Sequence, residues 1–266
     1  MAHVDSQAKL APAQSSSLVM MDARSLAAAI RARQVSCVEV MSAYLDHIER
    51  INPLVNAIVA LRDRDDLLAQ AKQKDAQIAR AEATGPLHGL PFAVKDLFPV
   101  KGMRTTSGSL ILKDFVAPAD SVMVTRLRKA GAIIIGKTNT PEFGLGAHTY
   151  NAVYGATRNA YDRSRSAGGS SGGAAVALAL RMLPLADGSD YGGSLRNPAG
   201  WNNVLGFRTS FGRVPADGRD AWLPSMGVLG PMARLVRQLP TFKLELGGDV
   251  ADGPAAIRSL LRDTGR

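Results

Sequence analysis

Two Gly/Ser loops, GGSSGG at residues 168–173 and GSDYGGS at residues 188–194, hold the residue types best suited to chemistry in this sequence. Each loop sets serine hydroxyls beside glycines, which reach backbone conformations that bulkier residues resist. Serines presented in this way are typical of nucleophilic acyl-transfer sites. Composition alone favours a flexible linker for the first loop and a tight turn for the second. Two such loops around one helical segment make that interpretation weaker.

The second loop also offers backbone donors. Successive amides of Tyr191, Gly192, Gly193 and Ser194 can converge on one point, and a nest of N–H groups at the start of a helix binds anions. An oxyanion hole is one use of such a nest. A phosphate-binding loop is another, but neither loop ends in the Gly-Lys-Ser/Thr pattern that this motif requires.

Lys95 lies in the apolar segment LPFAVKDLF at residues 90–98, which is typical of a buried strand. A lysine acts as a base only when it is neutral, and its free pKa of about 10.4 keeps it protonated at pH 7. Burial lowers the pKa of a lysine, which is the direction that a general base needs. Taken alone, the residue is more typical of a lysine at a strand end, paired with Asp96 or another carboxylate, than of a general base.

The blocks around these residues resemble the amidase signature family of serine hydrolases in their order and spacing. The resemblance covers roughly residues 22–234. It rests on GLPFAVKDLFPVKGMRTTSGS at 89–109, GAIIIGKTNTPEFGLGAHT at 131–149, GATRNAYDRSRSAGGSSGG at 155–173 and GSDYGGSLRNPA at 188–199. It implies hydrolysis of a linear carboxylic amide to an acid and ammonia or an amine.

The resemblance also implies a role for each site residue. Lys95 matches the general base, Ser170 the serine that follows a cis peptide bond and relays the proton, and Ser194 the nucleophile. The oxyanion hole is implied for the backbone amides of Tyr191, Gly192, Gly193 and Ser194. Supporting roles are implied for Ser171, Asp190 and Arg196. The mechanism needs no cofactor.

Two other functions remain open at this point. One is the A-type subunit of a glutamine-dependent amidotransferase, from the same family, which supplies ammonia to a misacylated tRNA and requires partner subunits. The other is a truncated, non-catalytic remnant that binds a ligand or a partner. A serine-directed probe and glutaminase assays separate these alternatives.

Composition and charge exclude several function classes. A chain of 266 residues with 46% hydrophobic content can bury a large core. The single cysteine, Cys37, forms no internal disulfide, and the first residues contain no continuous apolar run, so we expect a cytoplasmic protein without a membrane span. One cysteine and four scattered histidines predict no metal site and no Ser-His-Asp triad.

The net charge of +9 comes from 32 basic residues dispersed among 23 acidic ones, without a long Lys/Arg block. Such dispersed charge is typical of a solvated surface, and predicts no direct contact with nucleic acid. The expected partner is a small-molecule amide substrate, and homo-oligomerisation is left open.

Alternating elements must position these loops. We expect helices over residues 36–49, 65–83, 121–130 and 174–182, and strands over residues 56–61, 132–135 and 185–189, in addition to the strand of Lys95. Ser36 and Glu39 form a capping-box pattern at the first of these helices. This alternation predicts an α/β fold with a mixed, largely parallel sheet covered by helices on both faces.

Three segments are expected along the chain. Residues 1–21 form a poorly ordered N-terminal extension, residues 22–234 the N-terminal part of the amidase signature domain, and residues 235–266 a divergent tail. Members of the family continue past GPMAR, here residues 230–234, with further helices and strands. We therefore expect a C-terminally truncated or frame-disrupted member of the family, or a short variant. Each of these would have lower activity, because a sheet without its neighbouring strands exposes apolar faces and unpaired edges.

Overall fold

A computed structural model of the chain describes residues 17–217 and 225–234. The divergent tail at 235–266 and most of the proposed N-terminal extension lie outside the described residues. The division of the chain into three segments therefore stays a prediction.

The strand of Lys95 belongs to a three-stranded sheet of order β1-β3-β2. Strand β2 (Pro91–Lys95) runs parallel to β3 (Ile133–Thr138), and β1 (Ile58–Val59) runs antiparallel to β3. Every residue of β2 and β3 is buried, as expected for apolar strands covered on both faces. The predicted burial of the Lys95 strand is thus confirmed.

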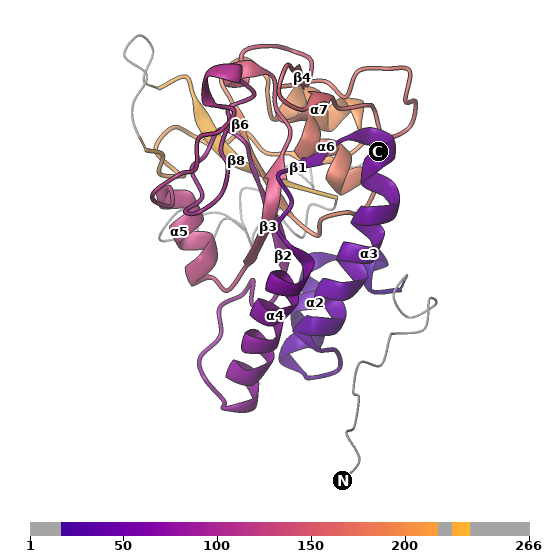
Figure 1. The fold of residues 1–266 in the computed structure, drawn as a ribbon, viewed down its shortest axis with the longest axis vertical. Coiled ribbons are helices and arrows are strands. Elements are labelled where there is room, and N and C mark those ends of the chain that lie inside the picture. Colours follow the sequence, from indigo (N-terminus) through magenta and orange to yellow (C-terminus); the bar gives the residue numbers. More distant parts are fainter. Residues whose placement is uncertain (1–16, 218–224, 235–266) are drawn as a thin grey trace, which may run out of the picture.

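A second three-stranded sheet of order β6-β8-β7 carries the second Gly/Ser loop. Strand β8 (Val228–Ala233) pairs antiparallel with both β6 (Ala186–Asp190) and β7 (Leu205–Gly206). Strand β6 lies against β2, because the amide of Lys95 donates to the carboxylate of Asp187. Figure 1 shows β2, β3, β6 and β8 together in the centre of the molecule. A separate hairpin joins β4 (Tyr150–Asn151) and β5 (Gly155–Ala156).

The α/β class with mixed sheets is confirmed, but the parallel share is smaller than expected. Among the described strands, β2 and β3 form the parallel ladder, and the other ladders are antiparallel. The alternation of strands and helices predicted crossover connections between parallel neighbours. Strand β6 follows β3 through the β4–β5 hairpin and a helix, but it pairs with β8, a strand that the sequence pattern did not indicate.

Helices pack around these strands. They are α2 (Ala23–Arg31), α3 (Cys37–Val55), α4 (Arg64–Ala79), α5 (Val122–Lys129), α6 (Gly172–Ala179) and α7 (Arg196–Trp201), with short 3-10 turns at Leu110–Leu112 and Glu142–Gly144. Figure 1 shows α5 on one side of the central strands, α2 and α3 on the other, and α4 below the strands. No helix in the described ranges is long and apolar enough to cross a bilayer.

Local sequence signals account for several helix ends. The Ser36 hydroxyl accepts from the Glu39 amide at 3.1 Å, and the Glu39 carboxylate accepts from the Ser36 amide at 2.8 Å, so the predicted capping box is present. Helix α3 continues beyond its predicted end at residue 49 and stops at Asn56, which has a φ of 53°. Helix α5 ends just before Gly131, as predicted.

Helix α6 is the element that brings the two loops together. Its residues 172–178 are all buried, because glycine and alanine let it approach the sheets closely. A Cβ atom on Gly173 would lie 2.3 Å from the backbone nitrogen of Asn139. The first Gly/Ser loop thus ends in the molecular interior, at the N-terminus of a buried helix.

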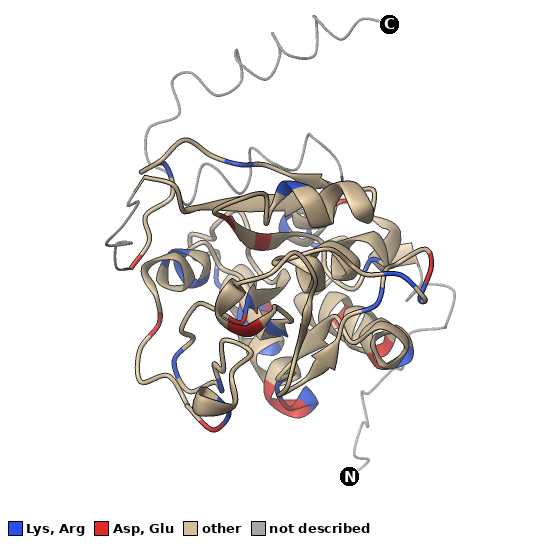
Figure 2. Cartoon of the chain, turned by 90° about the horizontal axis from the view of Figure 1, so that it is seen from above, with Lys and Arg blue, Asp and Glu red and all other residues tan. Residues whose placement is uncertain are grey.

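Charged residues are dispersed over the described part of the chain. Figure 2 shows blue and red segments scattered over the helices and loops. This distribution agrees with the sequence pattern of interspersed Lys, Arg, Asp and Glu.

Candidate active site

The side chain of Lys95 ends among three serine hydroxyls. It lies at the C-terminal end of β2 and is fully buried. Its Nζ donates to Ser170 Oγ at 2.7 Å, to Ser189 Oγ at 2.9 Å and to Ser171 Oγ at 3.0 Å. The two Gly/Ser loops therefore meet at this one nitrogen, as the sequence-based hypothesis requires.

The backbone of the first loop holds Ser170 and Ser171 in place. The peptide bond between Gly169 and Ser170 is cis, as the family resemblance implied. Gly168 has a φ of 72°, and a Cβ atom there would lie 3.0 Å from Pro198 Cα, so the position requires glycine. The Ser171 amide donates to the Ser194 carbonyl at 3.2 Å and ties the first loop to the second.

Ser194 lies on the wall of a cavity of ≈ 940 Å³, which Ser170 and Ser189 also line. Its side chain is half-buried. Apolar residues make up much of the wall, among them Leu97, Phe98, Phe143, Leu145, Val214 and Leu229. The predicted relay serine and the predicted nucleophile thus line the same cavity, whose volume is large enough for a small substrate.

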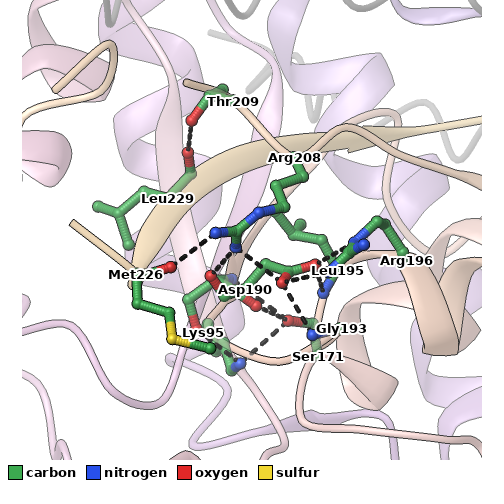
Figure 3. Close-up of polar contacts among 11 residues, drawn as sticks. Lys95, Ser171, Asp190, Gly193, Leu195, Arg196, Arg208, Thr209, Met226 and Leu229 are labelled. Carbon is green, nitrogen blue, oxygen red and sulfur yellow. Dashed lines mark hydrogen bonds and ion pairs between the residues drawn. The ribbon is translucent and has the colours of Figure 1, made fainter. Parts of the chain in front are cut away.

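The carboxylate of Asp190 organises the second loop. It accepts from the Gly193 amide at 2.8 Å and from the Leu195 amide at 3.2 Å. Arg196 donates to it through Nε at 3.0 Å and Nη2 at 3.1 Å, and Arg208 donates through Nη1 at 2.9 Å. Figure 3 shows both guanidinium groups pointing at this carboxylate. Burial acts to raise the pKa of Asp190, but the donors from Arg196 and the amides outweigh it and hold the pKa at about 2.

One amide of the expected oxyanion hole has a partner in this structure, because the Gly193 N–H is bonded to Asp190. The amides of Tyr191, Gly192 and Ser194 make no hydrogen bond to another described residue. The backbone turns here through Gly193, which has a φ of 122°. Three amides of the predicted four are thus available to an oxyanion.

Burial sets the protonation of the lysines. Removal from water lowers the pKa of Lys95 to about 7, although the charges of Asp187 and Asp190 act in the opposite direction. Lys137, on β3, is also buried, and its pKa falls to about 8 for the same reason, against the charges of Asp96 and Asp187. The Nζ of Lys137 donates to the Phe98 carbonyl and lies 3.8 Å from Asp96 Oδ1.

Sequence reasoning missed four polar residues around the site: Asp187, Ser189, Lys137 and Arg208. A signal existed for the first two, because alternate residues of the predicted strand at 185–189 lie on one face. No such signal existed for Lys137 or Arg208, which reach the site from other elements. Within the described ranges, no group of three or more His, Cys, Asp or Glu side chains is arranged to hold a metal ion.

Comparisons with known proteins agree with this architecture. The model of the Amidase family matches residues 39–252. The A-type subunit of glutamyl-tRNA(Gln) amidotransferase from Acidothermus cellulolyticus is 45% identical over 221 residues, which are 83% of this chain and 44% of that protein. The chain spans about half the length of the curated relatives it matches.

Solved structures give the same result. A bacterial aryl acylamidase of the amidase signature family superimposes with a TM-score of 0.80 at 35% identity, over 88% of this chain and 49% of the other. The peptide amidase from Stenotrophomonas maltophilia superimposes with a TM-score of 0.78 at 34% identity, over 89% and 50%. The chain therefore belongs to the Amidase family and has the amidase signature fold.

Proposed function

We propose that this chain carries the catalytic machinery for hydrolysis of a linear carboxylic amide, with Ser194 as nucleophile, Ser170 as proton relay and Lys95 as general base. The observation that carries the proposal is the 2.7 Å contact between Lys95 Nζ and Ser170 Oγ beside the cavity that Ser194 lines. A pKa of about 7 supports it, because about half of such a lysine is neutral at pH 7.

In the proposed first step, neutral Lys95 takes the proton of the Ser170 hydroxyl while Ser170 takes the proton of Ser194. The Ser194 oxygen forms a bond to the carbonyl carbon of the amide, and the carbonyl oxygen becomes an oxyanion. The amides of Tyr191, Gly192 and Ser194 are the donors that we assign to this oxyanion. The relay is suitable because a serine hydroxyl both donates and accepts.

In the second step, the Lys95 ammonium returns its proton through Ser170 to the leaving nitrogen, and the C–N bond breaks. Water then attacks the acyl ester on Ser194, with Lys95 again accepting the proton through Ser170. That proton returns to Ser194 Oγ as the ester C–O bond breaks, which releases the acid and restores the free enzyme. Asp190 keeps the second loop in shape through its bonds to Arg196 and the loop amides. Ser171 and Ser189 hold the lysine nitrogen in position.

A second candidate is release of ammonia from glutamine within a multi-subunit amidotransferase. The observation that favours it is the 45% identity to the A-type subunit of a glutamyl-tRNA(Gln) amidotransferase. This function would require partner subunits to accept the ammonia. Turnover of glutamine only when such partners are added supports this candidate, whereas turnover of simple aryl or aliphatic amides by the chain alone supports the first.

A fluorophosphonate probe tests the proposed nucleophile directly. We expect one phosphonyl adduct on the wild type by intact mass, none on Ser194→Ala, and slow labelling of Ser170→Ala. Ser210→Ala is the matched control, because Ser210 lines the same cavity and has no proposed role. Equal labelling of the wild type and Ser194→Ala contradicts the proposal, and a wild type that resists the probe supports the non-catalytic alternative.

A further inference from the structure

A buried carboxylate that the proposed mechanism does not use accepts a hydrogen bond from the backbone of Lys95. Asp187 is the second residue of β6 and is fully buried. Its Oδ1 and Oδ2 atoms accept the backbone amide of Lys95 at 3.1 and 3.3 Å. Burying a carboxylate costs free energy unless hydrogen bonds or opposite charges stabilise it. The groups around Asp187 therefore indicate the role of this residue.

The charges that face Asp187 come from the neighbouring strands of the first sheet. They are Lys95 on β2 and Lys137 on β3, and Lys137 in turn lies 3.8 Å from Asp96. The other described elements packed on β6 supply none, because helix α6 and strand β8 contain no titratable side chain. These two lysines and the carboxylates of Asp96 and Asp187 are all buried, and together they make up a cluster of charged groups.

The cluster addresses a difficulty of a buried base. Full desolvation makes a lysine neutral, but it also makes the lysine a poor proton acceptor, because the ammonium formed in the reaction is not solvated. A fixed negative charge nearby stabilises that ammonium at the moment the proton arrives. Asp187 and Asp190 both raise the pKa of Lys95, Asp187 more strongly. The Asp190 carboxylate is in addition bonded to Arg196 and Arg208.

We propose that Asp187 is a positioning residue for the reaction: it anchors the backbone of Lys95 and supplies the counter-charge that lets this lysine accept and return the serine proton. The inference rests on the proposed function for its catalytic meaning. The electrostatic coupling between the two side chains can be measured without any turnover. Burial raises the pKa of Asp187 itself to about 6. Because this value is still below 7, the carboxylate is mostly ionised at pH 7.

The decisive variant is Asp187→Asn, which keeps an oxygen to accept the Lys95 amide and removes the charge. In the wild type, the ¹³Cε resonance of Lys95, identified by its loss in Lys95→Met, should titrate near pH 7. We expect the midpoint to fall by about one pH unit in Asp187→Asn, because Asp187 is the carboxylate that raises the pKa of Lys95 most, and an opposite charge raises a lysine pKa by that order. Asp75→Asn is the matched control: its carboxylate also accepts backbone amides, those of Cys37 and Val38 at the start of α3.

Phosphonylation of Ser194 gives the functional readout. The ratio of the rate at pH 6 to the rate at pH 9 should rise in Asp187→Asn, by at most about fivefold, because a midpoint one unit lower leaves half of the lysine neutral at pH 6. The rise is below that maximum because Asp187 of the wild type is only partly ionised at pH 6. The rate at pH 9 should fall, because the lysine is a weaker base. A purely structural role would lower both rates and leave their ratio unchanged.

The outcomes separate this inference from the proposed function. An unshifted Lys95 midpoint in folded Asp187→Asn overturns the inference, whether or not the chain reacts with the probe. If the Lys95 midpoint shifts but the chain does not react with the probe, the electrostatic coupling between Asp187 and Lys95 stands and the catalytic proposal is overturned. If Asp187→Asn does not fold, the reciprocal measurement decides: the Asp187 carboxyl should titrate at higher pH in Lys95→Met than in the wild type, and an equal midpoint refutes the coupling.

Discussion

The pH dependence of Ser194 acylation is the sharpest test of a desolvated lysine base. Because burial lowers the pKa of Lys95 to about 7, the neutral base appears as the pH rises through 7. The neutral fraction is about a tenth at pH 6, half at pH 7 and nine tenths at pH 8. The rate of phosphonylation should therefore rise about tenfold from pH 6 to pH 8 and level off above it.

A lysine with its ordinary pKa gives a different curve. With a pKa of about 10.4, the neutral fraction rises about a hundredfold from pH 6 to pH 8 and keeps rising to pH 9 and beyond. The assay is the second-order rate of adduct formation by intact mass, in buffers of constant ionic strength. Lys101→Met, at an exposed lysine, should reproduce the wild-type curve. A profile that is flat, or that rises without a plateau, refutes the assignment of Lys95 as a buried base.

Three further predictions concern stability. Gly188→Ala should lower the free energy of unfolding by about 1–3 kcal/mol, since its Cβ would lie 2.6 Å from Leu195 Cδ2. Gly200→Ala should leave the free energy of unfolding unchanged, because a Cβ there meets nothing within 4 Å. Equal losses of unfolding free energy for the two variants in urea denaturation would contradict the packing argument. Ser36→Ala should lower the free energy of unfolding by about 1 kcal/mol, because it removes the capping box. An unchanged midpoint of thermal unfolding would contradict this prediction. Because the pKa of Asp190 is depressed to about 2, its stabilisation is complete above about pH 4 and declines toward pH 2. The stability difference between the wild type and Asp190→Asn should therefore shrink on acidification, and a constant difference would argue otherwise.

Local sequence patterns determined much of the framework. The apolar run around Lys95 predicted a buried strand, and the Ser36/Glu39 pattern predicted where α3 begins. Both signals act within a few residues, so they can be read without knowledge of the fold. The two Gly/Ser loops indicated where serines would be presented, and the structure brings Ser170, Ser171 and Ser194 to one region.

Only the tertiary structure decided how the strands pair and which polar groups surround the lysine. The antiparallel pairing of β6 with β8 brings together residues that lie some forty positions apart in the chain, and no local pattern encodes such a partner. The same holds for Asp187, whose charge acts on Lys95 from β6, and for Lys137, whose charge acts on Asp187 from β3. These effects depend on burial and on distances across strands, and both are properties of the packed sheets rather than of any sequence segment.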